Sequence, residues 1–83
     1  MNTVFLLLAE FGEADIPLER VAPKYFGIES KKALQKAALQ QLPVPCFRAG
    51  TQKSQWLVSV HHLAKYLDEK RAEAEREWRD MNI

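Results

Sequence analysis

The sequence predicts a mainly α-helical fold with a small β-hairpin, arranged as a winged helix-turn-helix with an extra N-terminal helix and a long C-terminal helix. Two short segments with helical apolar spacing fill residues 17–42 and are separated by Gly27, which can adopt the positive φ of a tight turn. Two runs rich in aromatic and β-branched residues follow within residues 46–60 and flank a polar, glycine-containing stretch. Residues 61–81 then return to helical spacing.

Length and composition restrict the class of protein. A chain of 83 residues is expected to form a single domain over residues 1–83, too small for a deep enzyme cleft with a second lobe. Its 47% hydrophobic and 28% charged residues are ordinary for a folded globular protein, so disorder is not expected. The only cysteine, Cys46, excludes an intrachain disulfide and is interpreted as a small buried hydrophobic residue.

Residues 1–12 are predicted to form the N-terminal helix, with Asn2 or Thr3 as its cap and Gly12 as its stop. This helix is apolar nearly all round, which favours either a central position or contact with a second copy of the chain, the central position being preferred. Its apolar run is too short for an export signal or a membrane span, so we expect a cytoplasmic protein that does not contact membranes.

The first helix of the predicted helix-turn-helix begins near Pro17, which is tolerated in a first turn. Its expected buried face consists of Leu18, Val21, Ala22 and Tyr25. Pro23 lies inside this segment and removes a backbone donor, so we expect the helix to break or restart there.

The second helix is predicted over residues 29–41, because Pro43 and Pro45 prevent it from continuing. Its expected buried face consists of Leu34, Ala37, Ala38 and Gln41, and its expected outward face carries Lys32, Gln35, Lys36 and Gln40. The alanines would let this helix pack closely against the first one.

Two strands are predicted at Cys46–Arg48 and Trp56–Val60, joined by residues 49–55. From Lys31 to Lys53 the chain has five basic residues and no carboxylate, although the net charge is only +1. An acid-free loop favours contact with a phosphate backbone, but small polar residues are also typical of any exposed hairpin tip.

The C-terminal helix, residues 61–81, is too long for its apolar content. We expect its distal half, with Trp78, to project from the core or to contact a partner, the alternative being a solvated and partly frayed end. Catalytic groups are few: His61 and His62 are adjacent and diverge on a helix, and no cluster has zinc-binding spacing. We expect no enzyme activity, no metal and no cofactor.

Several segments together match a known family. They are Asn2-Thr3 with Phe5-Leu6-Leu7-Leu8-Ala9-Glu10-Phe11, Ile16-Pro17-Leu18, Lys24-Tyr25-Phe26-Gly27, Lys36-Ala37-Ala38-Leu39, Leu42-Pro43-Val44-Pro45 with Phe47-Arg48, Gln52-Lys53, Trp56, Leu63-Ala64, Asp68-Glu69, Arg71-Ala72-Glu73-Ala74 and Trp78. Over essentially its full length the chain resembles the pyocin activator family (PrtN), small regulators carried by bacteriocin clusters and prophages. Its middle resembles the broader excisionase and MerR-like winged helix-turn-helix class.

The resemblance implies a sequence-specific, double-stranded DNA-binding transcriptional regulator that activates bacteriocin or prophage genes. The alternatives are a prophage excisionase, also called a recombination directionality factor, and a protein-binding adaptor that docks on RNA polymerase or a phage protein. Because so small a site gives limited affinity, we also expect a homodimer or a cooperative oligomer on DNA.

The predicted mechanism places the helix over residues 29–41 in the major groove, with glutamines reading bases and lysines shared between bases and phosphates. The second helix contains no arginine, the residue most often used to read guanine. The predicted DNA-binding residues are Ser30, Lys31, Lys32, Gln35, Lys36, Gln40, Arg48, Thr51, Gln52, Lys53, Ser54 and Gln55. The predicted oligomerisation residues are Phe5, Leu8, Leu67, Ala74 and Trp78.

Overall fold

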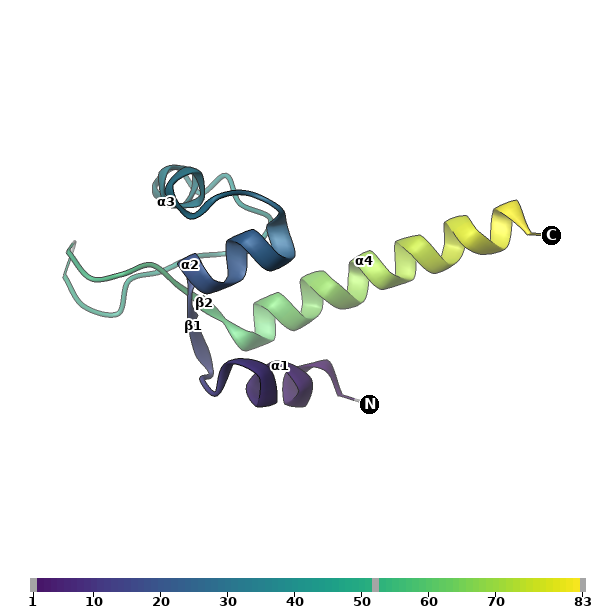
Figure 1. The fold of residues 1–83 in the computed structure, drawn as a ribbon, viewed down its shortest axis with the longest axis horizontal. Coiled ribbons are helices and arrows are strands. Elements are labelled where there is room, and N and C mark those ends of the chain that lie inside the picture. The colour runs from purple at the N-terminus through teal and green to yellow at the C-terminus, as the bar shows by residue number, and fades with distance from the viewer. Residues whose placement is uncertain (1, 52, 83) are drawn as a thin grey trace.

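The computed structural model describes residues 2–51 and 53–82 and is mainly helical, with one small antiparallel sheet (Figure 1). Its elements, in chain order, are α1 (Thr3–Phe11), β1 (Asp15–Pro17), α2 (Leu18–Val21), the π-helix η1 (Ala22–Phe26), α3 (Ser30–Ala38), β2 (Leu57–Ser59) and α4 (Val60–Met81). The expected mainly α-helical class with a small sheet is therefore confirmed.

Local signals at both ends define α1. The side chain of Asn2 accepts a hydrogen bond from the backbone N–H of Val4 at 2.8 Å, which satisfies a donor that the helix itself leaves free. At the other end Gly12 has a φ of 74°, and its N–H donates to the carbonyl of Leu8 at 2.8 Å. The cap and stop predicted from the sequence are both confirmed.

The expected central position of α1 is wrong. Only Leu7 and Phe11 are buried, whereas Phe5 is 69% and Leu6 46% exposed. The helix packs against α4 through one face, as Figure 1 shows, and leaves another apolar face bare. The apolar residues of α1 thus form two faces: one packs against the core, and the other is not covered by the described part of the chain.

Residues 15–17 form a strand, although the sequence suggested a helix entry there. β1 pairs antiparallel with β2 in a register that places Ile16 opposite Val58, and both side chains are fully buried. The pairing partner lies about forty residues away in the sequence, so no local signal announces it. Pro17 has no backbone N–H to donate to the neighbouring strand, and it lies at the end of β1, where a proline is tolerated.

The helix that follows changes type next to Pro23, in agreement with the predicted break or restart: α2 ends at Val21 and η1 begins at Ala22. Leu18, Val21 and Ala22 are fully buried, as the spacing predicts. At Ala22 the helix widens into the π-helical turn η1, in which the N–H of Gly27 donates to the carbonyl of Ala22. Pro23 is the second residue of η1, so its missing donor falls where the α-helical hydrogen bonding changes to the wider π-helical turn.

α3 is shorter than predicted, and its buried face only partly matches the predicted one. It ends at Ala38, because Gln40 adopts a φ of 53° and the N–H of Gln41 donates back to the carbonyl of Lys36 at 2.9 Å. This left-handed termination precedes the prolines. Its fully buried residues are Ala33 and Ala37, whereas Ala38 and Gln41 are exposed, so the predicted face was wrong at those two positions.

The predicted hairpin is reduced to one bridge. Phe47 and Leu57 exchange backbone hydrogen bonds of 3.1 and 2.8 Å, and no longer strand forms at Cys46–Arg48. The main partner of β2 is instead β1, on its other side. Leu57 therefore lies between Pro17 and Phe47.

α4 extends well beyond the folded body. Its 22 residues span about 33 Å, and residues 73–82 are all exposed. Figure 1 shows its C-terminal half extending away from the other elements, as expected from its length. Within residues 2–51 and 53–82, no helix is both long and apolar enough to cross a membrane.

Candidate nucleic-acid interface

The outward face of α3 carries Lys32 and Gln35, two of the four side chains expected there, together with Lys31. Lys31, Lys32 and Gln35 are exposed, opposite the buried Ala33 and Ala37. Close packing through alanines lets α3 lie against α2 while its long side chains extend into solvent.

The start of α3 is attached to α2. The hydroxyl of Ser30 donates to the backbone carbonyl of Glu19 at 3.2 Å, so this predicted contact residue has an intramolecular role. Lys36 is half-buried on the flank of α3. Of the predicted lysines on this helix, Lys31 and Lys32 are thus the more accessible.

The loop between Phe47 and Leu57, here called the 48–56 loop, contains a compact turn. The hydroxyl oxygen of Thr51 accepts from the backbone N–H of Lys53 at 3.2 Å, and the Thr51 carbonyl accepts from Ser54 at 3.0 Å. Lys53 and Gln55 are exposed as a result. Gln52, also predicted to bind DNA, lies outside the described residues.

Arg48 and Trp56 face each other across the base of this loop. The guanidinium carbon of Arg48 lies 4.5 Å from the centroid of the Trp56 ring. Since Phe47 bridges Leu57, positions 48 and 56 form the next cross-strand pair, and side chains at such positions are neighbours. The stacking restricts the arginine while keeping its charge.

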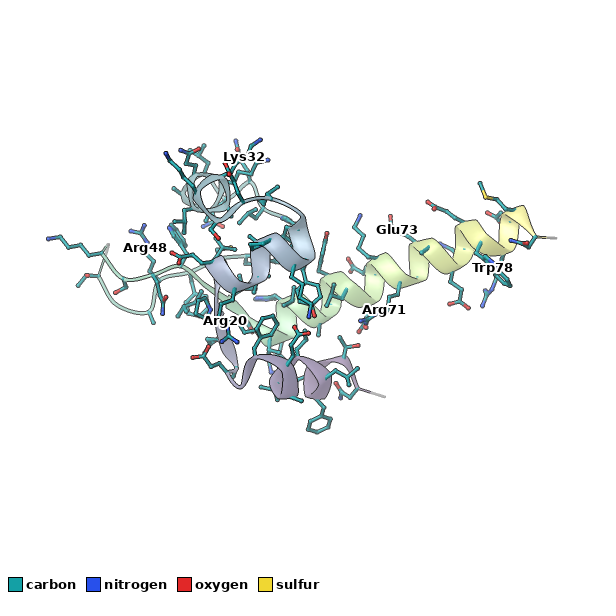
Figure 2. All side chains as sticks on the ribbon, viewed as in Figure 1. Arg20, Lys32, Arg48, Arg71, Glu73 and Trp78 are labelled. Carbon is teal, nitrogen blue, oxygen red and sulfur yellow. The ribbon has the colours of Figure 1, made fainter. Side chains whose placement is uncertain are left out.

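A hollow of about 300 Å³ separates α3 from the 48–56 loop. Its lining residues are Glu19, Leu34, Gln35, Arg48, Ser54, Gln55 and Trp56. Four of the predicted DNA-binding residues are therefore brought together from segments that are distant in sequence. Figure 2 shows Lys32 and Arg48 at the end of the molecule opposite Trp78.

Sequence reasoning did not assign three of the seven lining residues to the site: Glu19, Leu34 and Trp56. Glu19 comes from α2 and places a carboxylate beside a surface that the sequence portrayed as free of acids. Trp56 was noted only as a strand residue, although the hairpin register would have paired it with Arg48.

Gln40 does not lie on the outward face of a helix, because α3 has already ended. Its side-chain amide donates to the carbonyl of Cys46 at 3.4 Å and joins the end of α3 to the segment before Phe47. Cys46 itself is buried, and this burial raises the pKa of its thiol.

The predicted oligomerisation residues divide into two groups. Leu8 and Leu67 are partly buried and pack against the core of their own chain. Phe5, Ala74 and Trp78 are exposed, with Trp78 64% accessible. The second group is the more accessible to another molecule.

A polar cluster ties α1 to η1. Glu10 accepts from Lys24 and from the hydroxyl of Tyr25, the latter at 2.8 and 3.0 Å to its two oxygens. The hydrogen bond from Lys24, followed by that from Tyr25, lowers the pKa of Glu10, and the same contact raises the pKa of Lys24. Burial, with the hydrogen bond to Glu10, raises the pKa of Tyr25.

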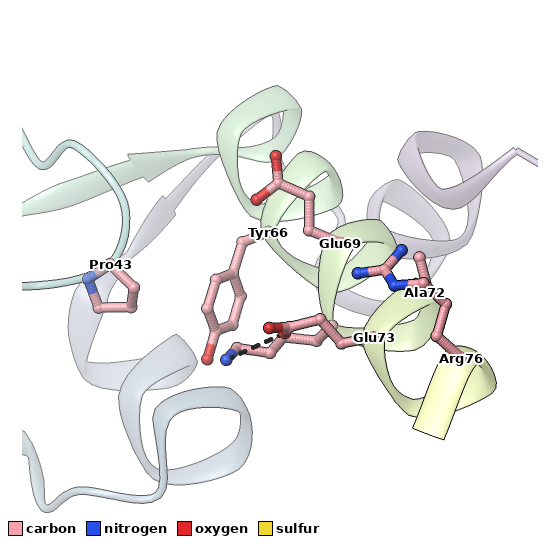
Figure 3. A pocket seen from close by; sticks show the side chains of 7 residues that line it. Pro43, Tyr66, Glu69, Ala72, Glu73 and Arg76 are labelled. Atoms are coloured by element: carbon pink, nitrogen blue, oxygen red, sulfur yellow. Dashed lines mark ion pairs between the residues drawn. The ribbon is translucent and has the colours of Figure 1, made fainter. Parts of the chain in front are cut away.

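A wider hollow of about 490 Å³ lies between Pro43 and α4 (Figure 3). Acidic and basic side chains alternate along it, and Lys70 pairs with Glu73 at 3.4 Å. Because positive and negative charges alternate on this surface, it offers no net attraction for a polyanion such as DNA. Among the residues that the structure describes, no group of three or more histidines, cysteines or carboxylates could hold a metal ion.

Comparisons with known proteins give one positive result. No curated protein and no solved structure matched the chain. The family model described as pyocin activator protein PrtN matches residues 3–74, from the first turn of α1 to the exposed half of α4. Since this match covers far more than half of the sequence, the chain belongs to the pyocin activator (PrtN) family.

Proposed function

We propose that this chain is a sequence-specific, double-stranded DNA-binding regulator that activates pyocin or related prophage genes. In this proposal residues 1–83 form one winged helix-turn-helix domain, with α2, η1 and α3 as the helix-turn-helix and the 48–56 loop as the wing. The observation that carries it is the hollow between α3 and the 48–56 loop, where Gln35, Arg48, Ser54 and Gln55 converge.

α3 is the element proposed to enter the major groove. Its nine residues span about 13 Å, and a helix fits a groove about 12 Å wide. Gln35 lies at the middle of the exposed face and has the amide geometry that pairs with adenine. Lys31, Lys32 and Lys36 would contact phosphates beside it, and Ser30 would add a hydroxyl at the helix start.

The 48–56 loop is proposed to contact the backbone or the adjacent minor groove. Arg48 is held against Trp56, so less side-chain freedom is lost when it binds a phosphate. Lys53 and Gln55 are exposed on the same loop, with Thr51, Gln52 and Ser54 as further polar contacts. Gln40 is proposed to contact DNA only at the edge of the interface, because its side-chain amide already donates to the carbonyl of Cys46.

A salt titration tests the proposal. Fluorescence anisotropy of labelled duplexes from the pyocin gene region would be measured with increasing salt. If Lys31, Lys32, Lys36, Arg48 and Lys53 each neutralise a phosphate, the slope of log affinity against log salt concentration should be about −4.5. A slope near zero, or no binding to any duplex at low salt, would contradict DNA binding and favour a protein-binding adaptor.

The outcome of binding is tested by sequencing the genomic fragments that the protein retains. An activator should retain promoter fragments of pyocin or prophage genes. Retention of attachment regions instead would identify an excisionase. Contact with RNA polymerase is expected only for the activator and can be measured on the retained promoter fragments.

A further inference from the structure

The apolar stripe of α4 continues after the folded body ends. Val60, Leu63 and Leu67 pack into or against the core. Ala74, Trp78 and Met81 repeat the same helical spacing, so they lie on the continuation of that face. Yet Trp78 is 64% and Met81 86% exposed.

The bare part of this stripe lies beyond the N-terminal end of α1. The hydroxyl of Thr3 donates to Asp68 at 2.6 Å and accepts from Arg71 at 3.3 Å, which places the start of α1 beside residues 68–71. Figure 2 shows Trp78 on the side of α4 that faces α1. The exposed Phe5 and Leu6 lie off the packed face of α1, whose buried residues are Leu7 and Phe11, so they are not part of this stripe.

The total accessible surface of this elongated chain can be compared with that of a compact monomer and with the area that a dimer buries. A compact monomer of 9.6 kDa should expose about 5,100 Å², whereas this chain exposes 5904 Å². Its radius of gyration of 14.3 Å likewise exceeds the roughly 12 Å of a compact chain of this length. The excess area, about 800 Å², comes from the elongated shape as a whole and is comparable to one partner's share of a standard protein interface.

We propose that two copies of this chain pair antiparallel through the distal halves of α4, with Trp78 of each copy packed over Ala74 of the other. A two-fold axis near residue 76 brings these large and small side chains together twice. Met81 then reaches Arg71 of the second copy, which contacts Thr3 at the start of its α1. Antiparallel pairing also puts the two folded bodies at opposite ends, where they cannot collide.

This proposal stands without the proposed DNA binding. The face used by the dimer lies at the far end of the molecule from Lys32 and Arg48, so pairing leaves α3 and the 48–56 loop free (Figure 2). If DNA binding is also correct, the dimer carries two copies of α3 related by a two-fold axis. The test therefore uses the protein without DNA.

Sedimentation equilibrium of the full chain, over a wide concentration series, measures the association. The wild type should reach twice the monomer mass of 9.6 kDa, with little dependence on salt because the contact is mainly apolar. Trp78→Glu and Met81→Glu should weaken association roughly tenfold or more. The matched control is Leu39→Glu, since Leu39 is 66% exposed but lies beyond α3, and it should associate like the wild type.

One substitution tests the pairing itself. Ala74→Trp adds apolar surface but fills the space opposite Trp78, so it should weaken a specific dimer, whereas non-specific association would become stronger. Circular dichroism controls for folding, because Ala74 and Trp78 lie outside the core. A monomeric wild type, unaltered association of Trp78→Glu, equal loss in Leu39→Glu, or stronger association of Ala74→Trp would each overturn the proposal.

Discussion

The guanidinium carbon of Arg48 lies 4.5 Å from the centroid of the Trp56 ring. This pair closes the base of the 48–56 loop and lines the hollow beside α3. The indole face stabilises the cation and limits its rotamers, so the arginine is ordered before any ligand arrives. In the proposed complex, loop rigidity and phosphate contact therefore depend on the same pair.

Replacing the indole should weaken DNA binding through Arg48. Without the indole, ordering the Arg48 side chain on binding should cost about 1 kcal/mol, so Trp56→Ala should reduce duplex affinity about fivefold. Trp56→Phe keeps an aromatic face and should lose less. Anisotropy measures the affinity, and thermal unfolding of both variants reports any loss of packing. Equal affinity in Trp56→Ala and the wild type would show that the stacking has no part in binding.

Removing the Gln35 amide should change sequence preference more than overall affinity for unrelated DNA. A side chain that reads a base contributes about 1 to 3 kcal/mol of discrimination and no phosphate charge. Selection from a random duplex pool should therefore show relaxed preference at one position for Gln35→Ala, with an unchanged salt slope. Lys32→Ala is the comparison, since it should lower affinity uniformly and reduce the slope by about 1. An identical selected motif for Gln35→Ala would exclude base reading by this residue.

Gly27 should tolerate asparagine better than alanine. Its φ of 67° is left-handed, and no atom would obstruct an added Cβ, so the cost of substitution is conformational. Gly27→Ala should lower the free energy of unfolding by about 1 to 2 kcal/mol. Asparagine enters this region more readily, so Gly27→Asn should lose less. Urea unfolding gives both values, and an equal loss in the two variants would contradict a purely conformational cost.

The Glu10 cluster should make stability depend on pH at both extremes. The pKa of Glu10 is lowered from 4.5 by Lys24, so its contribution is present above pH 4.5 and is lost as the pH falls through the lower folded-state pKa. The pKa of Lys24 is raised from 10.5, so its contribution is present below pH 10.5 and is lost as the pH rises through the higher folded-state value.

Unfolding of the wild type and Glu10→Gln measures this dependence. The difference between them should be greatest near neutral pH and shrink in acid. It should also fall with added salt, because the side chains of Lys24 and Glu10 are 56% and 33% exposed. A difference that is the same at neutral and strongly acidic pH would assign the loss to something other than charge.

Local chemistry made part of the fold predictable. Asn2 and Gly12 define α1 because caps act within a few residues, and the buried spacing of Leu18 and Val21 holds because α2 packs one regular face. The strand β1 was missed since its partner is distant in sequence, and Pro17 resembles a helix start equally well. The pairing of β1 with β2 therefore determined the structure here, against the local helix signal of Pro17.

The residue types of the candidate site could be predicted from the sequence, but their arrangement in space could not. Lysines and glutamines marked α3, yet the end of the helix at Ala38 depends on the left-handed backbone of Gln40, which no residue type requires. Glu19 enters the hollow only because α2 and α3 pack together. Tertiary contacts thus decide which polar side chains share a surface.

A gel shift with two matched double variants tests the central claim most directly. Lys32→Ala with Lys36→Ala removes two charges from α3, while Lys65→Ala with Lys70→Ala removes the same charge from α4. The first variant should abolish the shift of a pyocin-region duplex with its far-UV circular dichroism intact, and the second should bind like the wild type. Unchanged binding by the α3 variant, or equal loss in both, would contradict the placement of α3 on DNA.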